Sequence, residues 1–405
     1  MIYCTMFSSL TLPTGAHHYY SGVSRLLSGF GTGIAFSKIL GMRPQRQDTV
    51  LANIGPFGFI YHYLRQRHNL HFRIVRDVQA PLLSSYLFCE NICSTLMEDY
   101  DAVLFPSEYA RQLYIRLFPR LNCNNTFVCY PILHRFPEQQ TRHRTRRKTI
   151  GCIGRLSEDK NIDQLLEAFF GMNDFDLVLC GHQVQPYLKE NIVRMMRNRG
   201  LEESRIEFTE TSSIWEILDR IDILAFPSTS SVESLGRVIM EASHMGIPVV
   251  AANHAASPEL LPGSNLLHVA YNNGPVSLEN PKPLGTVSVE ELRDKLKTSQ
   301  AIGSNDYYHD HDAKLKCILD GSCRPDEARD LDREVVRFIE AARVRLNDYR
   351  IPAREAVKAA VAHLSAGNYA DFAKTGYEIA EGLNYRPYLT LALDLPGDLE
   401  QNRSR

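Results

Sequence analysis

Two glutamates, Glu233 and Glu241, stand with seven residues between them in the stretch "SVESLGRVIMEAS". The residues around Glu241 have helical periodicity, and we expect a helix to begin near Leu235 with Ser234 as its N-cap. Glu233 would then lie at the positive end of the helix dipole, which favours its ionised form. Gly236 would let a phosphate approach the first-turn amides. One carboxylate beside a reacting carbon and one on a ribose hydroxyl is a coherent site, although two acids at this spacing also arise by chance.

A cationic pair lies upstream, in "IGRLSEDKNID". Arg155 and Lys160 follow an apolar strand-like run, and parallel α/β sheets bind phosphate at the carboxyl ends of their strands. Arg forks onto phosphate oxygens and Lys acts as a point charge, so the two could neutralise a diphosphate. The alternative is that both are surface charges paired with Glu158 and Asp159.

Strand-like and helix-like segments alternate on both sides of the Pro-, Gln- and charge-rich stretch "FPEQQTRHRTRRK". This alternation predicts two parallel, doubly wound sheets, each a Rossmann-like unit. The expected strands are 2–7, 49–53, 72–75, 102–105, 126–130, 149–154, 175–181, 205–208, 222–228 and 247–252. The expected helices are 23–40, 57–67, 87–97, 108–118, 162–170, 187–197, 214–219, 235–245, 289–297 and 324–346.

The resulting division is residues 1–140 as a first Rossmann-like domain, 149–300 as a second, and 301–405 as a helical tail. Residues 352–383 are expected to form two short amphipathic helices. The tail also contains "YYHDHD" at 307–312, which has metal-capable residues. A polar surface turn is the favoured interpretation of that stretch, ahead of a metal site.

Composition describes an ordinary globular protein, with 44% hydrophobic and 23% charged residues. The nine cysteines follow no regular framework and are expected to be reduced thiols. No apolar run is long enough to span a membrane. The sequence has no Walker loop, no H-E-x-x-H and no G-x-S-x-G elbow. The stretch "SGFGTG" (28–33) lies in an expected helix and is rejected as a nucleotide loop.

The charge is uneven along the chain, since residues 1–148 hold 17 Lys and Arg against 8 Asp and Glu. A basic first domain suits an anionic acceptor or an anionic membrane surface, or it reflects only the solvated linker "RHRTRRK". The segment 108–121 is basic and amphipathic enough to touch a membrane. Packing of this helix on its own sheet is the favoured alternative.

The ordered set "GRLSEDKN", "DILAFPS", Glu233 and Glu241 with Gly236, and "ASHMGIPVVAA" with Glu259 resembles glycosyltransferase family 4, the retaining GT-B enzymes. The resemblance covers about 110 residues, and extends more weakly to "YSGVSRLLSGF" and "DAVLFPSEYARQLY" in the first domain. It implies an α/β GT-B fold, in which two Rossmann-like doubly wound domains face each other across a cleft, with extra C-terminal helices. Residues 1–140 would then be the acceptor-binding domain and 149–300 the nucleotide-sugar-binding domain, and the tail 301–405 would cross back, in part, to the first domain.

The resemblance also implies roles for individual residues. Arg155 and Lys160 would hold the donor diphosphate, Glu241 the ribose, and Glu233 the transferred sugar near the reacting centre. The motif around Gly236, Leu235 and Ser234 would supply backbone amides, Phe208–Glu210 (Phe208 and Glu210 at its ends) would lie beside the base, and Gly22, or else Gly15, would approach the phosphates.

Three positions depart from the family pattern. Arg76 stands where the family has a histidine, and Asp77 follows it, so Asp77 either replaces that histidine in catalysis or belongs to a buried structural ion pair. The glycine-rich turn after the second strand of the donor domain retains only Gly181. Leu235 stands where an aromatic residue is common.

The expected activity is that of a retaining, metal-independent glycosyltransferase. It would move a sugar from a UDP- or GDP-sugar to a glycan or glycolipid, in cell-surface polysaccharide or glycolipid synthesis. We expect no cofactor, no bound metal and no nucleic-acid partner, and a cytoplasmic protein that touches the inner membrane face through its first domain. The alternatives are a catalytically idle GT-B scaffold that binds nucleotide sugar or a protein partner, and a GT-B phosphorylase.

Overall fold

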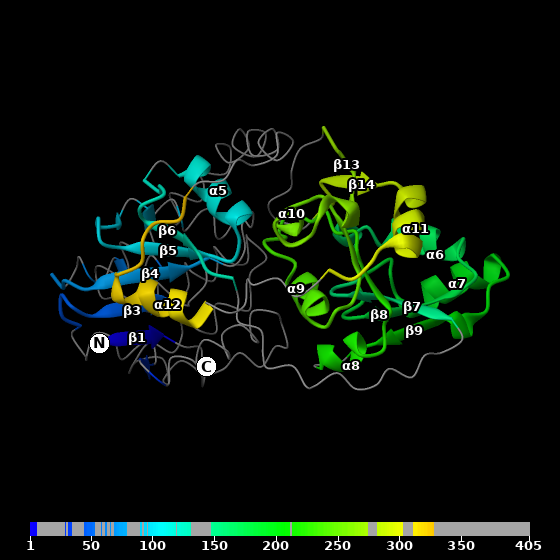
Figure 1. Ribbon diagram of the computed structural model, residues 1–405, viewed down its shortest axis with the longest axis horizontal. Helices are drawn as coiled ribbons and strands as arrows, with labels where there is room; N and C mark the ends of the chain where they lie inside the picture. Colours follow the sequence, from blue (N-terminus) through cyan, green and yellow to red (C-terminus); the bar gives the residue numbers. More distant parts are fainter. Residues whose placement is uncertain are drawn as a thin grey trace, which may run out of the picture. The chain divides into compact units, whose positions relative to one another are not determined.

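The structure is a computed structural model, and its chain divides into two compact units. Unit 1 comprises Met1–Ile132 and His309–Arg405, and unit 2 comprises Leu133–Tyr308 (Figure 1). The structure describes residues 1–5, 44–52, 69–78, 96–118, 120–130, 147–210, 213–273, 282–302 and 311–327, together with scattered positions between 29 and 34 and between 58 and 94.

Unit 1 is built on a six-stranded sheet in the order β2-β1-β3-β4-β5-β6, in which every pair is parallel. The expected strands are confirmed with small shifts of their ends. Their bounds are β1 Ile2–Thr5, β3 Thr49–Ala52, β4 Arg73–Asp77, β5 Ala102–Phe105 and β6 Thr126–Val128. The helix expected at 23–40 is wrong at its centre, where Thr32–Ile34 forms β2. Three glycines among residues 29–33 lower helix propensity there, and pairing with β1 favours the strand.

The helix α5 (Glu108–Leu117) packs on its own sheet, which confirms the interpretation favoured over membrane contact. Its apolar residues are buried and it lies along β5 and β6. Ser107 is the N-cap, because its hydroxyl accepts the Ala110 amide at 3.1 Å. The apolar side of this helix therefore contributes to the core of unit 1.

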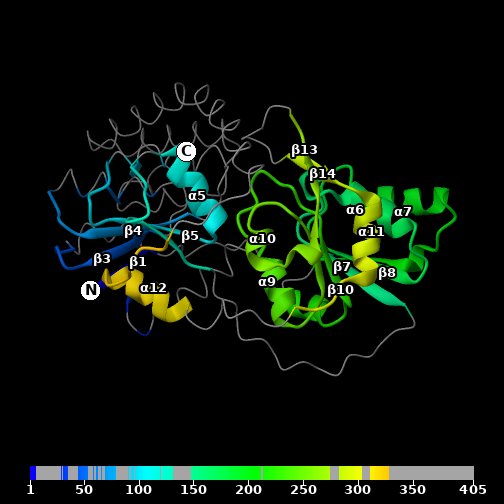
Figure 2. The ribbon, with the colours of Figure 1, turned by 45° about the horizontal axis from the view of Figure 1, so that its top comes forward.

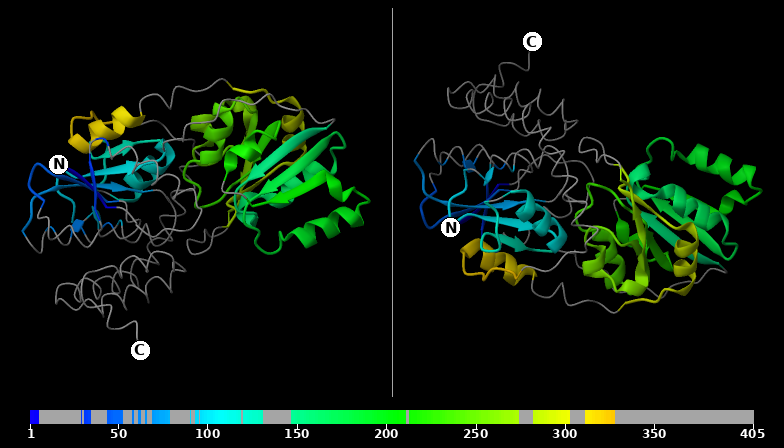
Figure 3. Two further views of the ribbon diagram at one scale, coloured as in Figure 1. Left: turned by 90° about the horizontal axis from the view of Figure 1, so that it is seen from below. Right: turned by 90° about the horizontal axis from the view of Figure 1, so that it is seen from above.

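The chain returns to unit 1 through α12 (His311–Asp320), a helix that the sequence analysis missed. Figure 3 shows this helix, in yellow, along one face of the unit 1 sheet. Its residues Leu315, Ile318 and Leu319 are buried in one cluster with Leu51 and Val75. The polar-turn interpretation is wrong for His311, which is buried and begins the helix, while 307–310 lie outside the described residues.

Hydrogen bonds fasten this returning segment to the sheet. The Arg73 guanidinium donates to the carbonyls of Ile318 and Leu319. The Arg111 guanidinium donates to the Asp326 carbonyl at 3.1 Å, and the Asp326 carboxylate accepts the amide of Val128, in β6, at 2.9 Å. Residues 311–327 are thus a structural part of unit 1. The expected helices at 324–346 and 352–383 lie outside the described residues, apart from 324–327.

Unit 2 contains the second six-stranded parallel sheet, ordered β12-β11-β10-β7-β8-β9. Its helices lie on both faces of the sheet (Figures 2 and 3). The strands are β7 Lys148–Ile153, β8 Phe175–Cys180, β9 Ile206–Thr209, β10 Ile223–Phe226, β11 Val249–Ala252 and β12 Leu266–Leu267. The order reverses between β7 and β10, as in a doubly wound nucleotide-binding sheet.

The helices of unit 2 agree closely with the sequence. They are α6 Ile162–Phe170, α7 Lys189–Asn198, α8 Ile214–Leu218, α9 Arg237–His244, α10 Ser257–Leu260 and α11 Val289–Thr298. A small antiparallel pair, β13 (Val269–Tyr271) and β14 (Gly285–Val287), adds to the unit. In the part of the chain that is described, no helix combines the length and apolar character needed to cross a membrane.

Candidate active site

The candidate residues of unit 2 gather at the carboxyl ends of β7 and β10, two neighbouring parallel strands. Arg155 and Lys160 follow β7, and Glu233 lies in the loop between β10 and α9. The strand order reverses at this pair, which is the position where open α/β sheets bind their ligands. Topology therefore brings together motifs that lie more than 70 positions apart.

Lys160 and Glu233 form a direct ion pair. The Lys160 Nζ donates to Glu233 Oε2 at 2.6 Å, and the two side chains are only 19% and 14% exposed. Burial by itself would raise the pKa of Glu233, but the charge and hydrogen bond of Lys160, with His254 and the Gly236 amide, hold that pKa below its ordinary value. Glu233 is therefore a carboxylate at neutral pH.

Arg155 is held by Asp159, which was the alternative raised from the sequence. Its Nη2 contacts the two carboxylate oxygens of Asp159 at 3.2 and 3.0 Å, and its Nε donates to Ser157 at 3.0 Å. Asp159 is buried, and its pKa is lowered despite burial by hydrogen bonds from Ser157 and Ser230 and by the nearby cations. The Arg155 side chain remains 39% exposed, so its guanidinium is oriented by Asp159 and still open to a ligand.

Glu241 is the second carboxylate, on the second turn of α9, and it is 2% exposed. Its Oε1 accepts from Arg237 at 2.7 Å, whereas its Oε2 is buried with no hydrogen-bond partner among the residues that the structure describes. Burial raises the pKa of Glu241, although Arg237 opposes this effect. A buried oxygen without a donor costs stability unless something else supplies one. A ligand hydroxyl would satisfy Oε2.

The start of α9 differs from the prediction. The helix begins at Arg237 with Gly236 as N-cap, and Ser234 is not the capping residue. Gly236 has φ +74°, and a Cβ there would approach the Ile239 side chain to 2.9 Å, so glycine is required. Its amide donates to Glu233 Oε1 at 3.0 Å. The Gly236 amide is therefore occupied by Glu233, and in the first turn the Ile239 amide donates to the Gly236 carbonyl at 2.8 Å. Leu235 is buried in packing, as its apolar side chain suggested.

The residues expected beside the base lie along the same sheet edge but further from the reversal. Phe208 is on β9, two strands from β7, and its ring lies 5.9 Å from Lys189 Nζ. Glu210 follows it and is 3.9 Å from the ring nitrogen of His182. The retained Gly181 has a steric reason, since a Cβ there would come within 2.1 Å of the Gly154 carbonyl oxygen. That close approach joins the loops after β7 and β8.

Unit 1 places Arg76 in a buried ion pair with Glu90. The Arg76 guanidinium donates to both carboxylate oxygens of Glu90, at 2.8 Å for Nη2 and Oε1. Asp77 is also buried, at the carboxyl end of β4, on the face of Val75 and away from Arg76. The ion pair at the position of the family's histidine thus joins Arg76 to Glu90 rather than to Asp77. The predicted glycine, Gly22, lies outside the described residues.

Two residues of this site escaped the sequence analysis. Asn161 takes φ +52° after Lys160, and its side-chain amide donates to the Pro227 carbonyl and the Thr229 hydroxyl, both at 2.9 Å. Asparagine tolerates this left-handed conformation better than most residues, which was an available signal. His254 is buried after β11 and contacts the Ser230 carbonyl. No group of three His, Cys, Asp or Glu residues in the described ranges is arranged to hold a metal ion.

Comparisons with known proteins agree with this geometry. Residues 135–263 match the family model described as glycosyl transferases group 1. The chain is 31% identical over 120 residues to D-inositol 3-phosphate glycosyltransferase of Corynebacterium glutamicum, covering 27% of this chain and 28% of the relative. It is 30% identical over 181 residues to a GDP-mannose-dependent α-(1-6)-phosphatidylinositol monomannoside mannosyltransferase of Mycolicibacterium smegmatis, covering 40% and 46%. Each match therefore spans less than half of the relative's length.

Solved structures extend the likeness to most of the chain. The crystal structure of Anabaena Alr3699/HepE in complex with UDP has a TM-score of 0.54 at 16% identity, covering 88% of this chain and 99% of that one. The complex of the same protein with UDP-glucose has a TM-score of 0.52 at 17% identity, covering 88% and 98%. At this identity the likeness shows the fold, which is the GT-B fold that the sequence predicted.

Proposed function

We propose that this chain is a retaining glycosyltransferase of the GT-B family 4 type that uses a nucleotide-diphosphate sugar, a proposal supported by its motifs, by the family-model match and by the similar proteins. The donor would be held by unit 2. The observation that carries the proposal is the joint arrangement of Lys160, Glu233 and Glu241. Lys160 is paired with Glu233 in the loop before α9, and Glu241, on α9 itself, has a buried carboxylate oxygen for which the described residues supply no donor.

This arrangement can bind both the diphosphate and the ribose of a nucleotide-sugar substrate. An ammonium has three N–H donors, and Lys160 uses one of them on Glu233. The others, with the Arg155 guanidinium, would hold the diphosphate. The ribose would donate a hydroxyl hydrogen to Glu241 Oε2, which would satisfy the one carboxylate oxygen of this group that is buried without a partner.

The proposed chemistry follows from where charge develops. As the sugar–phosphate bond breaks, negative charge grows on the diphosphate, and preorganised cations stabilise it without a metal ion. Positive charge grows on the anomeric carbon, and the ionised Glu233 stabilises it. The acceptor would attack from the leaving-group face, with the departing phosphate taking its proton, so the configuration is retained.

The acceptor class and the location are also proposals. The name of one relative contains D-inositol 3-phosphate, and the name of the other contains GDP-mannose and phosphatidylinositol monomannoside. We propose a glycan or glycolipid acceptor bound by the basic unit 1, a role in cell-surface polysaccharide or glycolipid synthesis, and peripheral contact with the cytoplasmic membrane face. The donor is a UDP- or GDP-sugar, since the names of the similar proteins include both nucleotides.

The first experiment is a thermal-shift series with UDP, GDP, ADP and TDP. A ligand at 100 times its Kd stabilises by about 2.7 kcal/mol, which is a measurable shift in melting temperature. The bound nucleotide then selects the sugar donors for an assay of nucleoside diphosphate release, run on the wild type and on Glu233→Ala. Release that is lost in the variant supports the proposal.

Three outcomes would contradict it. If no nucleotide stabilises the protein, the donor site is wrong. Binding without turnover of any donor would favour the idle scaffold, and a requirement for inorganic phosphate with formation of a sugar 1-phosphate would favour a phosphorylase.

A further inference from the structure

His254, which is not among the motif residues, contacts the same carbonyl oxygen, that of Ser230, as the Glu233 amide does. His254 follows β11, is 2% exposed, and has both ring nitrogens in hydrogen bonds. Its Nε2 lies 3.0 Å from the Ser230 carbonyl oxygen and its Nδ1 lies 3.1 Å from the Tyr271 hydroxyl. The two rings also pack at 5.9 Å between centroids. A buried histidine with two partners has a defined orientation.

The partners determine which nitrogen carries the hydrogen. A carbonyl only accepts, so Nε2 must donate to Ser230. In the neutral ring Nδ1 is then the acceptor for the Tyr271 hydroxyl at 3.1 Å, the shorter of two contacts of that hydroxyl, since the Asn253 carbonyl lies at 3.3 Å. Burial is the largest influence on His254 and lowers its pKa, while the Ser230 carbonyl and Glu233 act in the opposite direction. The ring is neutral at pH 7 and has one tautomer.

The Ser230 carbonyl connects this ring to Glu233, in the loop between β10 and α9. The same oxygen accepts the backbone amide of Glu233 at 3.1 Å. The side-chain carboxylate of Glu233 is in turn held by Lys160 and by the Gly236 amide. A continuous chain of hydrogen bonds therefore runs from Tyr271 through His254 and Ser230 to Glu233.

We propose that His254 is a positioning residue for Glu233: its ring, oriented by Tyr271, holds the Ser230 carbonyl and thereby sets the Glu233 carboxylate at the reacting sugar. This inference rests on the proposed function for its effect on catalysis. A displacement of about 1 Å in such a group can reduce the rate by about 100-fold. Position, rather than proton transfer, is the contribution of His254.

The neighbouring part of the loop is anchored independently, so loss of His254 should not unfold it. The Thr229 hydroxyl donates to the Gly285 carbonyl at 2.6 Å and accepts from Asn161 at 2.9 Å. The Thr229 carbonyl accepts the Leu284 amide at 2.9 Å. The histidine contacts the half of the loop from Ser230 to Glu233, and Ser230 is also bonded to Asp159 and bridged to Pro283, so this half keeps anchors when the histidine is replaced.

The test compares His254→Leu, which removes the N–H donor, with His254→Gln, whose amide can still donate to Ser230. His268→Leu is the matched control, because His268 is exposed on the same unit. For His254→Leu we expect kcat to fall about 10- to 100-fold. The Kd of the product nucleoside diphosphate should change less than about threefold, and the melting temperature should stay near that of the wild type. His254→Gln should recover most of kcat, and the control should match the wild type.

A second measurement does not depend on turnover. The pKa of the Glu233 carboxyl, followed by carbon-13 NMR, should rise more in His254→Leu than in His254→Gln, because both variants lose the direct effect of His254 on that pKa and only His254→Leu also loses the donor to Ser230 that positions the carboxylate. An unchanged Glu233 pKa together with wild-type kcat would overturn the inference, and so would equal losses of kcat, nucleotide affinity and melting temperature. A wild type that turns over no donor would overturn the proposed function instead, and the NMR result would still decide the positioning role.

Discussion

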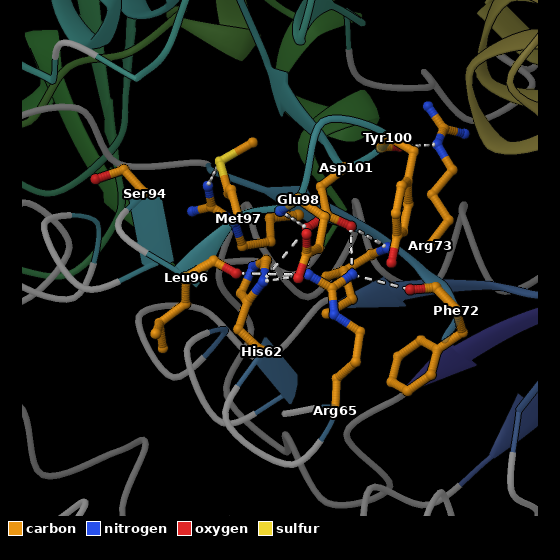
Figure 4. Close-up of polar contacts among 12 residues, drawn as sticks. His62, Arg65, Phe72, Arg73, Ser94, Leu96, Met97, Glu98, Tyr100 and Asp101 are labelled. Carbon is orange, nitrogen blue, oxygen red and sulfur yellow. Dashed lines mark hydrogen bonds and ion pairs between the residues drawn. The ribbon is translucent and has the colours of Figure 1, made fainter. Parts of the chain in front are cut away.

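The two units contain similar groups of buried charges that are completed in different ways. In unit 1, both carboxylate oxygens of Asp101 accept two hydrogen bonds, from Arg65 Nη1 and Nη2 at 2.7 Å and from the Ile74 and Glu98 amides at 2.9 Å (Figure 4). In unit 2, Glu241 accepts from Arg237 through one oxygen only. Both residues are buried carboxylates, but hydrogen bonds within the described residues occupy both oxygens of Asp101 and only one oxygen of Glu241.

This difference separates a structural role from a binding role. The Asp101 carboxylate ties β4 to the segment before β5, and every lone-pair direction it needs is used within unit 1. The Arg76–Glu90 pair is likewise buried and bidentate. Around Glu233 and Glu241, the cations remain partly exposed and an acceptor is left over. The two buried carboxylates thus differ in one respect, that Glu241 keeps an oxygen for which the described residues supply no donor.

The largest expected effect is on the saturated carboxylate. Asp101→Asn leaves Arg65 as a buried charge without its counter-ion, and breaking such a pair costs about 3–5 kcal/mol. Urea denaturation followed by circular dichroism should show this loss in the unfolding of unit 1. Glu203→Gln, in an exposed pair with Arg197, is the control and should leave the denaturation midpoint unchanged. A midpoint for Asp101→Asn equal to that of the control would contradict the structural role.

The next effect should come from the cation of the active site. Lys160→Gln removes the main group that lowers the pKa of Glu233, so that pKa should rise and the carboxylate should be lost at a higher pH. We expect kcat/KM to fall about 100-fold, since a preorganised charge is removed from the transition state. The acid limb of the pH–rate profile should also move to higher pH. An unshifted limb would show that Glu233 ionisation does not govern the rate.

A smaller effect should follow at Glu241. In Glu241→Gln the hydrogen bond from the ribose is weakened, and the affinity for the nucleoside diphosphate should fall about tenfold, or about 1.4 kcal/mol. Inorganic diphosphate, which lacks a ribose, is the control ligand and should bind both proteins equally by calorimetry. Equal losses for both ligands would place Glu241 at the phosphates and not at the ribose.

The smallest expected effect is on the pH dependence of stability. Burial lowers the pKa of His62 in unit 1 and of His254 in unit 2. Below about pH 6.5 these histidines are therefore protonated in the unfolded chain but remain neutral in the folded chain. The free energy of unfolding should therefore decrease as the pH falls from 7.5 to 5.5. Glu90 and Glu241 have raised pKa values and act in the opposite sense, nearer to the ordinary pKa of glutamate.

The histidine contribution can be isolated by substitution. His62→Gln should reduce the loss of stability between pH 7.5 and 5.5 by about 1 kcal/mol, because one titrating group contributes at most about 1.4 kcal/mol per pH unit. Urea melts at the two pH values measure this difference. A variant whose pH dependence equals that of the wild type would show that His62 titrates normally in the folded state.

Much of unit 2 could be predicted because its signals are local. An apolar run ending in Gly154 predicts β7, and the periodicity of 162–170 predicts α6 with the same bounds that the structure has. Unit 1 was harder. The strand β2 exists because β1 offers it a partner, which overrides the helix-like pattern of 23–40. The apolar stripe of α12 is formed by three residues, and the buried strand residues that it contacts lie more than 180 positions earlier in the chain.

The sequence by itself determined the order of strands and helices, the likeness to a GT-B glycosyltransferase, and the residues Arg155, Lys160, Glu233 and Glu241, because ordered motifs and periodicity are properties of neighbouring positions. Only the tertiary structure decided which charges meet. It paired Lys160 with Glu233, Arg155 with Asp159 and Arg76 with Glu90. It also left Glu241 Oε2 without a donor and placed His254 behind Glu233. The reason is that pairing and burial depend on distances between segments far apart in the chain, and those distances exist only once the sheets have formed.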